Sequence, residues 1–207
     1  MAFIKKRAVE SVTQDDRKHT RNCPDLLQSL EDDNATTRRW AARDLVNCPD
    51  ASAALVSLLK REPELSVREV ILSTLTQLGD ATAVAGLVDC LRSDDAALRN
   101  EAVEAMKHLP DEVAPMMQGL LADADPDVRI FTVNILESLC HPDVEAWLIE
   151  VISTDAHINV CATAVDLLSE VGTQKSLAPL EQLKQRFVDA PYMQFAANLA
   201  LRRIRAD

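Results

Sequence analysis

Apolar residues recur at intervals of three and four positions along most of this chain. Between residues 55 and 78 they are Leu55, Leu58, Leu59, Val67, Ile71, Leu75 and Leu78. Such intervals place side chains on one face of an α-helix, and the gap after Leu59 separates two successive helices. The pattern therefore predicts pairs of amphipathic helices, each with an apolar face to bury.

A longer repeat of about 30 residues is superimposed on this helical period. In four copies an arginine is followed seven positions later by Leu or Met: Arg38 with Leu45, Arg68 with Leu75, Arg99 with Met106, and Arg129 with Leu136. The pattern then weakens, with Cys161 before Leu168 and Gln194 before Leu201. We call the six earlier positions the arginine column and the six later ones the core column. One pair alone leaves its apolar face uncovered, so neighbouring pairs are expected to stack into a one-dimensional array.

Turn and capping residues divide the chain into six predicted helix pairs. Pro-Asp, Gly-Asp and Gly-Thr steps fall between pairs, and Asp95, Asp125 and Asp127 stand where second helices need N-caps. The first helices are predicted to begin near Pro24, Ala51, Thr82, Asp111, Asp143 and Lys175. The second helices are predicted to begin near Ala35, Ser66, Ala96, Asp127, Ile158 and Tyr192.

The repeated unit resembles a known family. The segments Asp-Pro-Asp-Val-Arg, ending at Arg129, and Leu-Gly-Asp-Ala-Thr-Ala-Val, beginning at Leu78, are similar to the short HEAT-like repeat named after phycobilisome lyase subunits. The resemblance spans about residues 24–205. It implies an all-α, right-handed α-solenoid of about six helix pairs, with the arginine column packed between repeats. It implies little about function, because unrelated proteins share this fold.

In solenoids of this kind the second helices line a concave groove, so the resemblance also implies which side chains face a partner. The candidate partner-binding residues are Arg39, Trp40, Arg43, Glu69, Ser73, Asn100, Glu104, Ile130, Phe131, Asn134, Glu137 and Asp166. Trp40 and Phe131 occupy a position that holds Val70 and Glu101 in other repeats, which makes both rings candidate anchors for a partner segment. The alternative is that they fill gaps between repeats.

The charge balance narrows the choice of partner. The chain has 22 Lys and Arg against 33 Asp and Glu, a net charge of −11, which disfavours binding of nucleic acid. Residues 108–174 hold one cation, Arg129, among twelve acidic residues. This acidic block either steers a basic partner segment or serves as a solvated surface. Because no apolar run approaches the ~18 residues of a membrane span, no membrane partner is expected.

The two ends of the chain differ from the repeats. Residues 1–22 are predicted to be a basic arm, or a capping helix with a linker, and residues 23–207 to form the solenoid. The N-terminus lacks a signal-peptide pattern, and five cysteines without a Cys-x-x-Cys pair predict reduced thiols in a cytoplasmic protein. Leu199, Leu201 and Ile204, together with Arg202, Arg203 and Arg205, predict a capping helix.

The motifs point to no catalytic constellation, and we assign no catalytic residue, cofactor or metal. Each of the four histidines is followed by Thr, Leu, Pro or Ile, whereas HEAT-like deoxyhypusine hydroxylases bind iron through His-Glu pairs. The net charge disfavours the basic groove of HEAT-like alkyl-purine DNA glycosylases. One weak metal candidate has as its members Cys140, His141, Asp155, His157 and Cys161. The alternative is buried cysteines beside loop histidines.

Two functions remain open. The preferred one is a non-catalytic interaction scaffold or assembly factor that holds a polypeptide in its groove. The other is a phycobilin-lyase-like subunit or cofactor-maturation chaperone, whose groove would need cations and aromatic rings to hold a tetrapyrrole. Arg39, Trp40 and Arg43 meet that need in one repeat only, which favours the scaffold.

Overall fold

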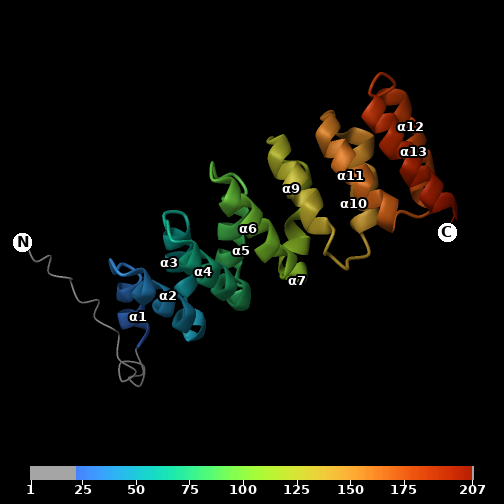
Figure 1. Ribbon diagram of the computed structural model, residues 1–207. Helices are drawn as coiled ribbons and strands as arrows, with labels where there is room; N and C mark the ends of the chain where they lie inside the picture. The colour runs from blue at the N-terminus through green and yellow to red at the C-terminus, as the bar shows by residue number, and fades with distance from the viewer. Residues whose placement is uncertain (1–21, 207) are drawn as a thin grey trace, which may run out of the picture.

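The computed structural model describes residues 22–206, and within that range every regular element is a helix (Figure 1). The first helices of the pairs are α1 (Cys23–Ser29), α3 (Ala51–Leu59), α5 (Ala81–Cys90), the interrupted α7 (Pro110–Val113) and α8 (Met117–Leu121), α10 (Val144–Thr154) and α12 (Leu177–Arg186). The second helices are α2 (Ala35–Asp44), α4 (Leu65–Leu78), α6 (Ala96–Lys107), α9 (Pro126–Leu136), α11 (Ile158–Val171) and α13 (Pro191–Ala206). Short 3-10 turns are η2 (Leu45–Asn47), η3 (Ala114–Met116) and η4 (Gln174–Ser176).

The pairs stack in chain order. The second helices α2, α4, α6, α9, α11 and α13 contact one another in succession, and among the first helices α3 contacts α5 and α10 contacts α12. Figure 1 shows the resulting elongated array, with α1 at one end and α13 at the other. The prediction of an all-α solenoid of about six helix pairs is therefore confirmed.

The core column forms the apolar interior of this array. Its members are Leu45, Leu75, Met106, Leu136, Leu168 and Leu201, and none is more than 2% exposed. They belong to one hydrophobic cluster that includes buried residues of every pair. Because each pair shares this cluster with its neighbours, burial of apolar surface couples the repeats.

The helix starts agree with the capping pattern to within two residues. Asp95 Oδ1 accepts a hydrogen bond from the backbone N–H of Ala97 at 2.8 Å, and Asp125 Oδ1 accepts one from that of Asp127 at 2.9 Å. The prediction that Asp127 is an N-cap was wrong. Asp127 lies in the first turn of α9, because Pro126 fits the first helical position and leaves Asp125 as the cap.

A Gly-Asp step joins the second pair to the third. Gly79 adopts a left-handed conformation with φ of 57°, and its N–H donates to the carbonyl of Leu75 at 2.9 Å, which ends α4. Asp80 then caps α5 by accepting from the backbone N–H of Ala83 at 2.8 Å. The chain therefore turns between pairs within two residues.

The first helix of the fourth pair is interrupted, which the apolar period did not indicate. α7 ends at Val113, the 3-10 turn η3 contains Pro115, and α8 begins at Met117. Proline has no N–H to donate, and its ring crowds the preceding turn of a helix. Pro115 therefore accounts for the break.

The cysteines correct one prediction. Cys23 and Cys48 form a disulfide with a Cα–Cα distance of 5.6 Å, so only Cys90, Cys140 and Cys161 are free. The two partners are 25 residues apart, and the folding of the first helix pair brings them together, so short motif spacing gives no sign of them. Disulfides persist mainly in oxidising compartments, and the cysteines therefore no longer support the predicted cytoplasmic location.

The predicted N-terminal arm, residues 1–22, lies outside the described residues except for Asn22. The Asn22 side chain caps α1 by accepting from the backbone N–H of Asp25 at 2.9 Å. Across residues 22–206, no helix combines the length and the apolar character that a bilayer span requires.

Candidate partner-binding face

The arginine column links neighbouring repeats through carboxylates. Arg38 donates from Nε and Nη2 to the two carboxylate oxygens of Glu62, at 2.7 and 2.6 Å. Arg129 donates in the same bidentate way to Asp155, at 2.6 and 3.0 Å. Bidentate pairs of this kind fix geometry as well as charge. These two guanidinium groups therefore hold repeats together.

Arg68 and Arg99 vary this arrangement. Arg68 is buried and contacts both Asp95 and Glu101, each at 2.8 Å. Arg99 instead donates to the carbonyl of Ser93 at 2.6 Å and lies 5.8 Å from the centroid of the Phe131 ring. All four arginines are thus engaged in contacts within the solenoid.

These contacts lower the pKa of the carboxyl groups that accept the hydrogen bonds. Burial acts to raise the pKa of Asp155, but hydrogen bonds from Arg129 and from the backbone N–H of His157 outweigh it and leave the pKa lowered. The hydrogen bond from Arg38 is the main cause that lowers the pKa of Glu62. Both carboxylates are therefore held in the charged form that the arginines require.

At the fifth repeat an arginine from another helix replaces the missing column member. Arg129 Nη1 donates to the carbonyl of Asp123, six residues before it in the chain, at 2.7 Å. In the fifth repeat the corresponding carbonyl is that of Asp155, and it accepts from Arg186 of α12 at 3.0 Å. Arg186 Nη2 also lies 3.2 Å from Cys161 Sγ. The repeat pattern gives no sign of this role, because Arg186 is distant in sequence and outside the repeat register.

The predicted groove residues lie mostly on one exposed side of the second helices, which we call the second-helix face. Side chains one and five positions after the arginine column define it. Exposed members are Arg39, Arg43, Glu69, Ser73, Asn100, Glu104 and Asp166, with Glu137 eight positions after the column; half-buried members are Ile130 and Asn134. These side chains are accessible to a partner on α2, α4, α6, α9 and α11.

Two hollows on this face bring predicted residues together. The α4/α6 hollow has a volume of about 540 Å³ and is lined by Glu69, Leu72, Ser73, Thr76, Gln77, Asn100, Glu101, Glu104, Ala105 and His108. The α9/α11 hollow has a volume of about 220 Å³ and is lined by Val133, Asn134, Glu137, Thr163, Asp166, Leu167 and Glu170. Each hollow contains three acidic side chains over an apolar base. Arg68 pairs with Glu101, and Lys107 pairs with Glu104 and Glu137, so within the described residues the carboxylates left without an ion pair are Glu69 in one hollow and Asp166 and Glu170 in the other. A cation carried by an apolar stem can therefore pair with Glu69 in one hollow and with Asp166 or Glu170 in the other.

The two aromatic candidates are only half-buried, and both have contacts within the protein. The Arg43 guanidinium lies 4.2 Å from the centroid of the Trp40 ring. Phe131 packs against the hydrophobic core and lies under Arg99. The arrangement of Phe131 agrees with the alternative that this ring fills a gap between repeats.

Helix α13 carries an exposed apolar stripe that is not among the predicted partner-binding residues. Tyr192, Phe195 and Leu199 are 58%, 66% and 39% exposed, whereas Leu201 and Ile204 of the same helix are buried. Phe195 and Leu199 stand one and five positions after Gln194, the last member of the arginine column. The register of the repeat therefore contained the signal, but the weak last repeat was interpreted only as a capping helix.

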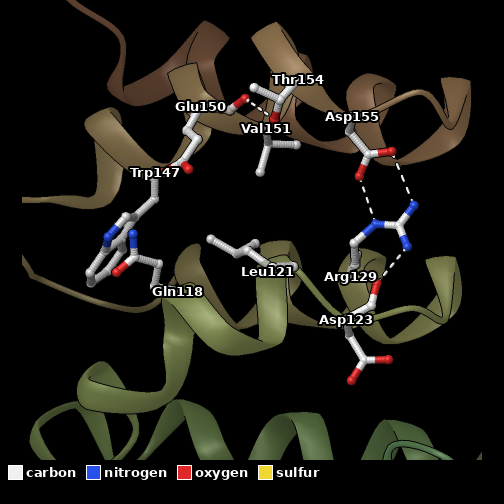
Figure 2. Close-up of a pocket in the computed structure, with 10 residues that line it drawn as sticks. Gln118, Leu121, Asp123, Arg129, Trp147, Glu150, Val151, Thr154 and Asp155 are labelled. Carbon is white, nitrogen blue, oxygen red and sulfur yellow. Dashed lines mark hydrogen bonds and ion pairs between the residues drawn. The ribbon is translucent and has the colours of Figure 1, made fainter.

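A further pocket of about 290 Å³ lies between α8 and α10 and is also lined by Arg129 of α9 (Figure 2). Figure 2 shows Trp147 beside Gln118 at one end, the pair Arg129 and Asp155 at the other, and Leu121 facing Val151 between them. The Trp147 ring also stacks on His141, with 4.9 Å between ring centroids. Since Asp155 and a carbonyl already hold Arg129, the pocket offers an anionic ligand no uncommitted guanidinium.

Three residues of the weak metal candidate make other contacts instead. Asp155 pairs with Arg129, His141 stacks on Trp147, and Cys161 lies against Arg186. Over the described range, 22–206, no group of three or more His, Cys, Asp and Glu side chains is placed to hold a metal ion.

Comparison with known proteins gives the family and the fold. A family model of HEAT repeats matches residues 5–107 and 113–203. No curated protein matches the chain. Among solved structures, Cex1p is similar with a TM-score of 0.51 and 15% identity, over 89% of this chain and 44% of that one, so this chain spans less than half of its length.

Two other structures have lower TM-scores. A designed armadillo repeat protein has a TM-score of 0.46 and 18% identity, over 88% of this chain and all of that one (100%). The complex of CpcE and CpcF of phycocyanin lyase from Nostoc sp. PCC7120 has a TM-score of 0.39 and 16% identity, over 98% and 100% of the two chains. At TM-scores below 0.5, neither of these two likenesses bears on the fold or the function of this chain.

Proposed function

This chain belongs to the HEAT-repeat family, and from that premise we propose that it is a non-catalytic scaffold or assembly factor that holds a polypeptide partner on its second-helix face. One observation carries the proposal: the two acidic hollows, between α4 and α6 and between α9 and α11, lie on the same face of successive second helices. A partner that crosses the helices can occupy both. Solenoids commonly bind their partners on an extended surface formed by successive repeats.

The chemistry of the face supports a polypeptide rather than a tetrapyrrole. The propionates of a tetrapyrrole require cations beside aromatic rings, and Arg39 and Arg43 with Trp40 provide them on α2. Arg99 also lies against the Phe131 ring, but its guanidinium already donates to the carbonyl of Ser93. Farther along, the hollows present carboxylates, which repel propionates. The scaffold is therefore the function we propose.

Site-specific photo-cross-linking tests the proposal. A photoreactive amino acid is placed at Ser73 or Asn134 on the second-helix face, and at Ser57 or Ala85, exposed on first helices, as matched controls. We expect one cross-linked protein species from both face positions in extracts of the native source, and none from the controls. Equal cross-linking from all four positions, or from the controls alone, would place the interface elsewhere.

A further inference from the structure

The α13 stripe, Tyr192, Phe195 and Leu199, is an apolar surface without a covering element among the described residues. Its members are spaced by three and four positions, so they share one side of the helix. The opposite side of α13 is already used, because Met193, Ala196 and Ala197 are buried against the solenoid. An aromatic pair with an aliphatic neighbour, exposed together, is characteristic of a binding surface rather than of scattered surface residues.

The stripe is continuous with the second-helix face. Phe195 follows Ile130 and Ala162 in the row of residues one position after the arginine column, and α9, α11 and α13 contact one another in that order. The hydroxyl of Tyr192 donates to Asp166 Oδ2 at 3.3 Å, and Asp166 lines the α9/α11 hollow. The apolar stripe and the acidic hollow are therefore adjacent parts of one surface.

The charges around this surface distinguish between occupants. The hollow contributes the carboxylates of Glu137, Asp166 and Glu170, and the chain as a whole carries a net charge of −11. A second copy of this chain, or an anionic lipid surface, would bring like charges together over the hollow. A cationic partner gains from the same field. Two cations among the described residues border the hollow: Lys107 pairs with Glu137, and Arg203 donates to Ser169 Oγ at 3.1 Å, next to Glu170 in the chain. The three carboxylates of the hollow outnumber these two cations, and Asp166 and Glu170 form no ion pair within residues 22–206.

We propose that the stripe and the α9/α11 hollow together bind a basic amphipathic helix, with aliphatic or aromatic side chains against Tyr192, Phe195 and Leu199 and with Lys or Arg in the hollow. Neighbouring helices pack about 8–10 Å apart, and an α-helix rises about 5.4 Å per turn. A partner helix that crosses this surface therefore needs its cation about two turns away from its apolar anchor. The inference rests on the proposed function and specifies the partner's chemistry.

Three fluorescein-labelled peptides of about 14 residues, four helical turns, serve as probes. One carries Leu on one face and Lys on the other, a second replaces Lys by Glu, and a third replaces Leu by Ser. We expect fluorescence anisotropy to show binding of the Lys/Leu peptide. We expect binding weaker by about tenfold or more for each of the other two, because one lacks the charge and the other the anchors.

Two pairs of variants locate the binding site. Phe195→Ala with Leu199→Ala, and Glu137→Lys with Glu170→Lys, should each weaken binding of the Lys/Leu peptide by about tenfold or more. Matched controls are Leu65→Ala, another exposed apolar residue at 54%, and Asp33→Lys with Asp94→Lys, an equal change of charge on exposed residues elsewhere. The controls should stay within about twofold of the parent. Circular dichroism and thermal melting first establish that every variant is folded.

Three results would overturn the inference. Equal weakening by the control charge pair would mean that the peptide responds only to net charge. A dimer in analytical ultracentrifugation that Phe195→Ala abolishes would make a second copy the occupant. If the peptide is indifferent to Phe195 and Glu137 while Ser73 and Asn134 still cross-link one protein, the inference fails and the proposed function stands. If cross-linking shows no preference for the face but the peptide results hold, the proposed function fails and the peptide-binding site stands.

Discussion

Arg129 shows how a single side chain can hold two repeats together. Its guanidinium contacts the carboxylate of Asp155 in the next repeat and the carbonyl of Asp123 in its own. The exposed fractions of the Arg129 and Asp155 side chains are 15% and 7%, so water screens the pair little. Arg99, at the same position one repeat earlier, lies over Phe131 and donates to the carbonyl of Ser93.

We expect Arg129→Ala to lower the free energy of unfolding by about 3 kcal/mol, because it leaves a buried carboxylate without its partner. Arg99→Ala, the matched control, should cost about 1 kcal/mol, because it removes a single hydrogen bond and a ring contact. Urea unfolding measures both. Equal losses would mean that the carboxylate contact adds nothing.

The Arg129 effect should also depend on pH. The pKa of Asp155 is lowered in the folded protein, so the pair stabilises the fold above the unfolded pKa of about 3.9, and this contribution is lost as the pH falls through the folded value. The difference between the parent and Arg129→Ala should therefore be largest near neutral pH and shrink in acid. A difference that grows as the pH falls would contradict the assignment.

The three free thiols should differ in reactivity. Cys140 is exposed, whereas Cys90 and Cys161 are buried, and burial raises the pKa of both buried thiols, that of Cys90 to about 11. Because the thiolate is the reactive form, Cys140 should be alkylated first in the native protein. Cys90 and Cys161 should react only on unfolding. Peptide mass spectrometry after alkylation without reduction measures this order and should also recover Cys23 linked to Cys48.

At the scale of helices, α3 and α5 meet where a glycine replaces a side chain. A Cβ atom added to Gly86 would lie 2.2 Å from Cγ2 of Val56, which is branched and has little freedom to move. Gly119 in α8 has no such neighbour within 4 Å. The two glycines are both helical but differ in the space around them.

We therefore expect opposite signs from the same substitution. Gly86→Ala should destabilise the protein by about 1–3 kcal/mol, because overpacking between α3 and α5 exceeds the gain in helix propensity. Gly119→Ala should raise stability by about 0.5 kcal/mol or leave it unchanged. Thermal melting of both variants checks the prediction. A stabilising Gly86→Ala would show that α3 and α5 separate without cost.

At the scale of the whole molecule, reduction of the disulfide tests whether destabilising the first helix pair also destabilises distant repeats. Cys23 and Cys48 both lie in the first helix pair, and contacts in a solenoid run mainly between neighbouring repeats. Reduction should lower the melting temperature of the first pair. The disulfide restricts the unfolded chain, and its loss should lower the free energy of unfolding by about 3 kcal/mol. Hydrogen exchange should then quicken in residues 23–48 and leave residues 144–206 unchanged. Faster exchange at both ends would indicate a single cooperative unit.

The sequence by itself determined the helical pairs, their starts to within two residues, and the core column. These features repeat locally, and each is set by side chains within one or two turns: Asp95 caps its own helix, and Leu75 takes its burial from the apolar period. The arginine column could also be identified from the sequence, because its spacing matches that of the repeat. The same register fixed which side chains lie on the second-helix face.

Only the tertiary structure decided which distant side chains meet. Arg186 replaces a column arginine at Asp155, and Cys23 reaches Cys48, because the folding and stacking of helix pairs bring together residues 25 to 31 positions apart. The hollows depend on side-chain size across neighbouring helices, which no local pattern encodes. Local chemistry sets each helix, and the stacking of the pairs then sets the surface they present.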